Sequence, residues 1–184
     1  MNRSKQLLES LNLVTEGDEA KIIRTALKKK LGLSNRDVSV KSSSYTAVNV
    51  GVKSMKALGK MKEIEAIGKS QEHIDRDERS GEILMGGNTF IFVEIDYDFR
   101  KKLVDIVQKE FVKQTGGKGN LEDKNSVVLF KTFEVNKSSN GPVFVNVKGK
   151  LNPNTEVRDM NYVGEAVIGL ISHVGDDSLY SKIK

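Results

Sequence analysis

Valine alternates with polar or small residues in two short segments of the chain, residues 38–40 and 48–52. Successive side chains of a β-strand point to opposite faces, so each segment is expected to be a strand that buries its valines on one side. Three serines, Ser42, Ser43 and Ser44, lie between the segments and suit an exposed connection. The pattern predicts a hairpin whose apolar face must be covered by a second layer.

Amphipathic helices are expected to supply that layer. Apolar residues recur every three or four positions in several segments, as is typical of helices with one buried face. The clearest segment is 98–114, where Phe99, Leu103 and Phe111 fall on one side. The same period predicts helices over residues 3–13, 18–31 and 55–70.

Two more hairpins are expected further along the chain. Glycine and asparagine at 86–88 tolerate the backbone of a tight turn and predict that strands 82–85 and 89–96 pair with each other. The apolar run at 90–93 is typical of a central strand. A third hairpin is expected from residues 127–135 and 143–147, with its turn at 138–142.

The end of the chain is ambiguous. Segment 157–174 suits either a helix or a strand, and Gly164, Gly169 and Gly175 favour a strand with bends. Residues 176–183 are expected to form a short helix.

These elements predict an α+β fold: an antiparallel sheet built from hairpins, with helices on one face and a β-rich C-terminal part. Glycine and polar residues at 115–120 predict a linker over 115–124, which would separate a domain of residues 1–114 from a smaller one of 125–184. The same segment does not match a phosphate-binding loop, because Lys118 is followed by Gly119 and not by Ser or Thr.

Several chemistries are excluded or disfavoured by composition. The chain has no cysteine, which removes disulfides, cysteine-based metal sites and thiol catalysis. Its two histidines, His73 and His173, are 100 residues apart in the chain and no nucleophile motif accompanies them. We therefore expect no enzyme activity, no cofactor and no metal. We also expect a cytoplasmic location, because no apolar run resembles a signal peptide or a membrane span.

A basic surface is the first candidate site. The formal charge is +5, which favours anionic partners. Ten cations lie close in sequence on neighbouring predicted elements and would contact nucleic-acid phosphates: Arg24, Lys28, Lys29, Lys30, Arg36, Lys41, Lys53, Lys56, Lys60 and Lys62. The alternative is an ordinary solvated helix face.

An acidic segment is the second candidate. Glu72, Asp75, Asp77 and Glu78 lie within a polar stretch, interleaved with Arg76 and Arg79. A protein partner, an exposed connection and the metal site of a nuclease all remain open for these carboxylates, although their spacing fits no calcium loop.

Part of the chain resembles a known group of domains. The segments are DVSVK at 37–41, VNVGV at 48–52, DRD at 75–77, SGEIL at 80–84 and GGN at 86–88. They are similar to domains of phage and conjugative-element proteins, including those associated with large polyvalent phage proteins. In size, charge and lack of cysteine the chain also resembles anti-CRISPR inhibitors of type II-A (Cas9) effectors.

These resemblances imply an accessory protein of a phage or mobile element that binds and inhibits a host defence nuclease, most plausibly a Cas9-type ribonucleoprotein. That role leaves direct contact with DNA or RNA open, and it places the protein in the cytoplasm of a bacterial host. The alternatives are a stand-alone nucleic-acid-binding protein and, lower, a metal-dependent nuclease. No membrane partner is expected, and the leucines of 3–13 suit packing either within the chain or in a homodimer.

Overall fold

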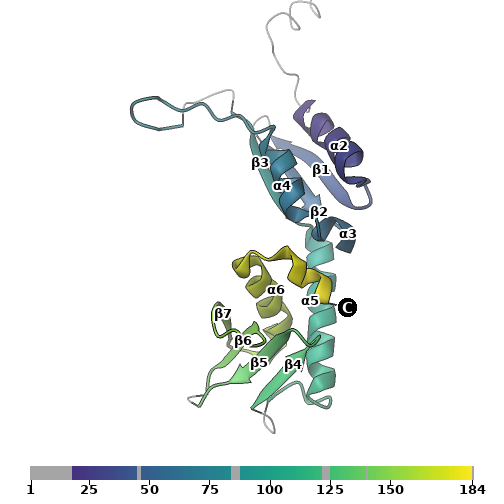
Figure 1. Cartoon of the computed structure of the whole chain (residues 1–184), viewed down its shortest axis with the longest axis vertical. Coiled ribbons are helices and arrows are strands. Elements are labelled where there is room, and N and C mark those ends of the chain that lie inside the picture. The colour runs from purple at the N-terminus through teal and green to yellow at the C-terminus, as the bar shows by residue number, and fades with distance from the viewer. Residues whose placement is uncertain (1–17, 45–46, 84–87, 122–124, 140, 184) are drawn as a thin grey trace, which may run out of the picture. The chain divides into compact units, whose positions relative to one another are not determined.

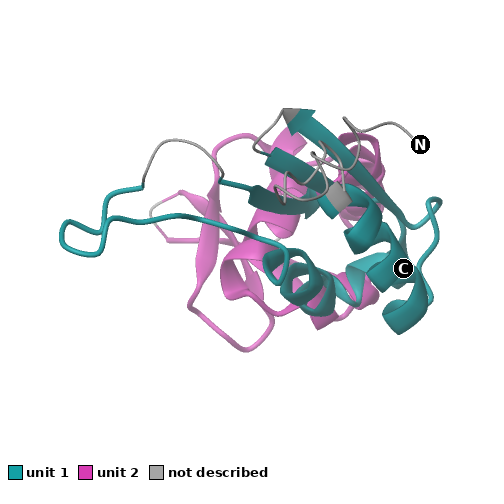
Figure 2. Cartoon of the chain, turned by 90° about the horizontal axis from the view of Figure 1, so that it is seen from above, with its two compact units in different colours: residues 1–94 teal, residues 95–184 magenta. Residues whose placement is uncertain are grey.

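The computed structural model describes residues 18–44, 47–83, 88–121, 125–139 and 141–183. By packing, the chain divides into two compact units, Met1–Glu94 and Ile95–Lys184 (Figure 2). The helix predicted over residues 3–13 lies outside the described residues. Each unit combines helices with a sheet, which confirms the predicted α+β class.

The first unit is a three-stranded sheet with helices on one face (Figure 1). Its elements are α2 (Asp18–Leu31), β1 (Val38–Ser44), β2 (Ala47–Val52), α3 (Met55–Leu58), α4 (Met61–Lys69) and β3 (Phe90–Ile95). The strand order is β1-β2-β3, and β1 runs antiparallel to β2 with Val40 opposite Val50. The predicted hairpin of alternating valines is therefore confirmed.

The valines of that hairpin form the core of the unit. Val50 and Val52 have no exposed surface, and Val38, Val40 and Val48 are nearly as buried. From the helical layer, Ile23, Leu27, Leu58 and Ile64 are also buried. Burial of each such side chain stabilises a fold by roughly 1.5–3 kcal/mol.

Three predictions in this unit are wrong. The helix expected over 55–70 is two helices, because the chain breaks at Gly59 and Lys60. The hairpin of 82–85 with 89–96 is not formed: backbone bridges join His73 to Thr89 and Arg76 to Ile83, and β3 pairs with β2. Strand β3 is at the edge of its sheet and not central, and its apolar run includes the exposed Phe92.

The second unit packs two helices against a four-stranded antiparallel sheet. Its elements are α5 (Tyr97–Gln114), β4 (Ser126–Leu129), β5 (Phe133–Lys137), β6 (Val143–Val147), β7 (Asn154–Val157), η1 (Met160–Tyr162), α6 (Val163–Val174) and η2 (Asp177–Lys182). The strand order is β4-β5-β6-β7. Helix α5 packs on α6 and β4, and α6 packs on β6 and β7.

Segment 157–174 is mainly the helix α6, so the preference for a bent strand is wrong. Val163, Val167, Leu170 and Ile171 recur at helical spacing and are fully buried. A Cβ on Gly164 would lie 2.5 Å from the backbone oxygen of Val104, so this glycine permits close packing of α6 against α5. A helix contact, and not a bend in a strand, explains this residue.

The strand expected over 127–135 is also interrupted. A tight turn joins β4 to β5, with the amide of Thr132 donating to the carbonyl of Leu129. The two central residues, Phe130 and Lys131, have φ angles of 50° and 61°, which bulky residues adopt at a cost.

Residues 115–120 form a compact turn after α5, within the second unit. The Oγ1 of the buried Thr115 donates to carbonyls of the last helical turn and accepts from the amide of Gly119. Packing therefore groups α5 with the C-terminal strands, whereas the sequence placed it with the first domain. No helix in the described part of the chain combines the length and apolarity that a membrane span requires.

Candidate nucleic-acid interface

A basic concavity lies where α2 meets the loop that leads to β1. It has a volume of about 600 Å³ and is lined by Arg24, Thr25, Lys28, Leu33, Ser34, Asn35 and Arg36. Arg24 and Lys28 are one helical turn apart on α2, so their side chains lie on the same face. The lining holds three cations and three small polar side chains but no carboxylate. This composition suits an anionic ligand with several oxygen atoms.

The loop that carries Arg36 is held by Asp37. One oxygen of its carboxylate accepts hydrogen bonds from the amide and hydroxyl of Ser34, at 2.9 and 2.8 Å, and the other accepts from the hydroxyl of Ser54 at 2.8 Å. These bonds, the Ser34 amide foremost and the Lys56 charge in addition, lower the pKa of Asp37 to about 2. Asp37 is therefore ionised at neutral pH and fixes the geometry of the loop.

Two of the predicted cations bond to the C-terminal end of α2. The ammonium group of Lys56 donates to the carbonyl of Gly32 at 2.7 Å, and that of Lys60 donates to the carbonyl of Leu31 at 3.0 Å. Carbonyls at the C-terminal end of a helix lack partners within the helix and carry partial negative charge. Lys56 and Lys60 satisfy these groups, and their charge offsets the negative end of the helix near the concavity.

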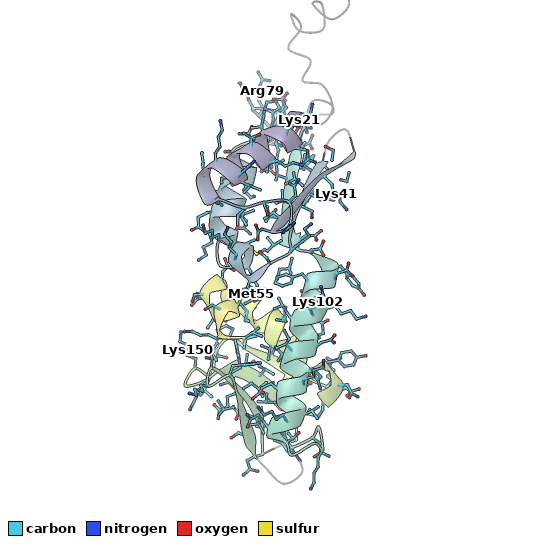
Figure 3. The ribbon with its side chains drawn as sticks, turned by 90° about the vertical axis from the view of Figure 1, so that its right-hand side faces the viewer. Lys21, Lys41, Met55, Arg79, Lys102 and Lys150 are labelled. Carbon is cyan, nitrogen blue, oxygen red and sulfur yellow. The ribbon has the colours of Figure 1, made fainter. Side chains whose placement is uncertain are left out.

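The remaining predicted cations lie in several places. Arg24 also donates to the carbonyl of Val40 on β1. Lys29 and Lys30 line a shallow depression on α2 together with Lys21, which Figure 3 labels. Lys62 is exposed on α4, Lys53 directly follows β2, and Lys41 lies on the sheet face opposite the buried valines. Of the ten predicted cations, Arg24, Lys28 and Arg36 therefore line one concavity, and the other seven do not line it.

The predicted acidic residues belong to an extended arm, residues 71–83, which leaves the body of the first unit after α4 (Figures 1 and 2). Glu72 lies at its base, where its carboxylate accepts from the amide of Ile91 and pairs with Lys69 at 3.9 Å. Asp75 pairs with His73 at 3.6 Å. Glu72 therefore joins the base of the arm to β3 and to the end of α4.

Asp77 organises the tip of the arm. Its Oδ1 accepts from the amides of Ser80 and Arg79 and from the Ser80 hydroxyl. These bonds, the Ser80 amide first, lower the pKa of Asp77. Glu78 lies in the same turn and is exposed. In the described parts of the chain, no three His, Asp or Glu residues are gathered closely enough to hold a metal ion.

Charge is segregated between the arm and the rest of the first unit. The arm holds two Arg against five Asp and Glu, a net of −3. The rest of residues 1–94 holds 14 Lys and Arg against 8 Asp and Glu, a net of +6. The sequence distinguishes the acidic segment from the basic one, and the fold adds that the acidic segment leaves the body of the first unit as the arm.

An exposed aromatic side chain was not predicted from the sequence. Phe92 on β3 is 53% exposed, although it belongs to an apolar run that predicted a buried strand. The available signal was the charged Glu94, which shares a strand face with Phe92 because side chains two residues apart point to the same side.

Comparison with known proteins supplies no relative: no family model, no curated protein and no solved structure matches the chain.

Proposed function

We propose that the first unit binds nucleic acid, with the phosphate backbone held by Arg24, Lys28 and Arg36. The concavity lined by these three cations, without a carboxylate, is the observation that carries the proposal. One guanidinium group can donate two parallel hydrogen bonds to two phosphate oxygens, and the ammonium group of lysine adds a compact charge on a flexible side chain. Ser34, Asn35 and Thr25 supply further hydrogen-bonding groups for the oxygens of a phosphate or sugar.

The charge balance of the unit supports the same function. With the acidic arm set apart, the net charge of +6 concentrates in the body that holds the concavity. A positive surface attracts a polyanion and releases its counterions on binding, so affinity falls steeply with salt. Each cation that contacts a phosphate adds a fixed amount to the slope of log affinity against log salt concentration.

Fluorescence anisotropy with labelled oligonucleotides over a range of salt concentrations tests the proposal. The variant Lys28→Glu/Arg36→Glu is expected to weaken binding strongly at low salt. Since each lost phosphate contact reduces the slope of log affinity against log salt by about 0.7 for a single strand or 0.9 for a duplex, two lost contacts reduce it by about 1.4–1.8.

The matched control is Lys102→Glu/Lys109→Glu, which changes the net charge equally at two exposed positions of α5. If the control and the test variant lose affinity equally, binding depends only on the net charge of the protein, and the concavity is not the binding site.

A second candidate function rests on a different feature, the acidic arm of residues 71–83. We propose that the arm docks on a positively charged channel of a nuclease ribonucleoprotein, as the resemblance to Cas9 inhibitors implies. No residue of 71–83 is buried, so the arm has little packing of its own. Two-stranded ribbons are marginal in water by themselves, and a partner surface would supply the missing contacts.

Co-purification with a Cas9–guide complex, and inhibition of its DNA cleavage, test this second function. The variant Glu78→Lys/Glu82→Lys alters exposed arm residues and spares the Asp77 side chain that holds the turn. Loss of inhibition is expected in this variant and not in Glu63→Lys/Glu65→Lys, which makes the same change on the exposed face of α4. No binding to such an effector by the unaltered chain would refute the proposal.

A further inference from the structure

Two aromatic side chains, Phe90 and Phe92, and the exposed Glu94 lie on the face of the first sheet opposite its helices. On β3, a Cβ added to Gly68 of α4 would lie 2.8 Å from Cγ2 of Ile91 and 3.5 Å from Cγ2 of Val93, so both of these residues face α4. Strand alternation then places Phe90 and Phe92 on the other face. Phe90 is half-buried, and Phe92 is 53% exposed.

On the same face of the sheet, strands β1 and β2 carry small or polar side chains. Ser39 lies opposite Gly51, and its hydroxyl donates to the Gly51 carbonyl at 3.3 Å. One step along the same face, Lys41 lies opposite Asn49. Since these side chains are small or flexible, the ring of Phe92 is accessible from above the sheet. Exposure of a single phenylalanine is common, and an exposed ring among polar side chains offers a face on which another flat ring can stack.

Cations connect this face to the basic concavity around the edge strand β1. Arg24, which lines the concavity, donates to the carbonyl of Val40, and the next residue along β1 is Lys41. Figure 3 shows Lys41 on the side of the sheet away from α2. Two strand spacings separate β1 from β3, so Lys41 and Phe92 lie on strands roughly 10 Å apart. Arg24 and Lys41 therefore place cations at the concavity and on the sheet face that carries Phe92.

This arrangement fits a single strand better than a duplex. In a duplex the bases are stacked on each other and expose only their edges in the grooves. In a single strand the bases can turn outward and stack on aromatic side chains while a basic path follows the phosphates.

We infer that this face of the β1-β2-β3 sheet is a stacking surface for unpaired bases, with Phe92 as the stacking residue and Lys41 as a phosphate contact. The inference rests on the proposed nucleic-acid binding and specifies its substrate as single-stranded DNA or RNA.

The test compares labelled oligothymidine, oligouridine and a DNA duplex of equal length by fluorescence anisotropy. Wild-type protein is expected to bind the single strands more tightly than the duplex. Phe92→Ala is expected to weaken single-strand binding about tenfold or more, a loss that persists at high salt because stacking is not electrostatic. Phe92→Tyr retains the aromatic ring, so its affinity for single strands is expected to stay within about twofold of that of wild type.

Leu151→Ala is the matched control, because Leu151 is a highly exposed apolar residue of the second unit. Circular dichroism of each variant verifies folding. Equal affinity of wild type and Phe92→Ala for single strands overturns the inference and leaves the concavity proposal standing. The oligomeric state of both proteins is measured as well. If the wild type forms a dimer that Phe92→Ala abolishes while oligonucleotide binding is retained, the inference is overturned and the face is a contact between copies. Absence of any nucleic-acid binding by the wild type would refute both proposals.

Discussion

Two glycines of α6 have opposite packing environments and should respond in opposite ways to the same mutation. A Cβ on Gly164 would lie 2.5 Å from the backbone oxygen of Val104 and 3.0 Å from its Cγ1, whereas a Cβ on Gly169 meets nothing within 4 Å. Ordinary contacts of a Cβ begin at about 3.4 Å, so Gly164→Ala requires α5 and α6 to separate by close to 1 Å.

The expected free energies follow from these distances. Overpacking of this kind costs about 1–3 kcal/mol, and the obstacle is backbone, which cannot rotate aside as a side chain can. Gly169→Ala has no such obstacle and gains the helix propensity of alanine, about 0.8–1 kcal/mol. The free energy of unfolding of the two variants should therefore differ by about 2–4 kcal/mol, in favour of Gly169→Ala.

Urea unfolding followed by far-ultraviolet circular dichroism measures this difference, since the chain has no tryptophan for fluorescence. With a slope of about 1–3 kcal/mol per molar urea, 2 kcal/mol displaces the midpoint by about 0.7–2 M. The reasoning is refuted if Gly164→Ala is as stable as wild type, because the two helices would then have room that the structure does not show.

Three further predictions concern stability in the two units. The pKa of Asp37 is lowered to about 2 from an ordinary value near 3.9, so its stabilisation is complete above pH 4 and is lost as the pH falls through about 2. Asp37→Asn should cost about 1 kcal/mol at pH 7 after allowance for solvent screening, and urea titrations near pH 2 should show the gap from wild type closing; a gap that is constant with pH would contradict this. Lys131→Gly should stabilise the chain by about 1 kcal/mol, because glycine adopts positive φ without strain, whereas Lys137→Gly within β5 should destabilise it in the same thermal-unfolding assay. Lys56→Ala/Lys60→Ala should lower stability by about 1 kcal/mol through loss of the two hydrogen bonds to the end of α2, yet leave the salt slope of oligonucleotide binding as in wild type; a reduced slope would show that these lysines contact phosphate.

The candidate site was partly predictable. Arg24, Lys28 and Arg36 were selected from local charge and helical spacing, and the fold gathers them around one concavity. Lys56 and Lys60 were selected on the same grounds, but their partners are carbonyls 24 and 29 residues earlier in the chain. Charge in a sequence reveals what a side chain can bind but not which acceptor the fold brings to it.

The valine hairpin and the helices with clear periodicity of apolar residues could be predicted from the sequence, because these elements depend on side chains only a few residues apart. Helix α5 and strands β1 and β2 follow directly from that local pattern. Tertiary structure decided the pairing of His73 with Thr89, the helical state of residues 163–174 and the grouping of α5 with the second unit. Each of these depends on contacts between distant segments: a glycine suits a bent strand and a close helix crossing equally well until the neighbouring backbone is in place.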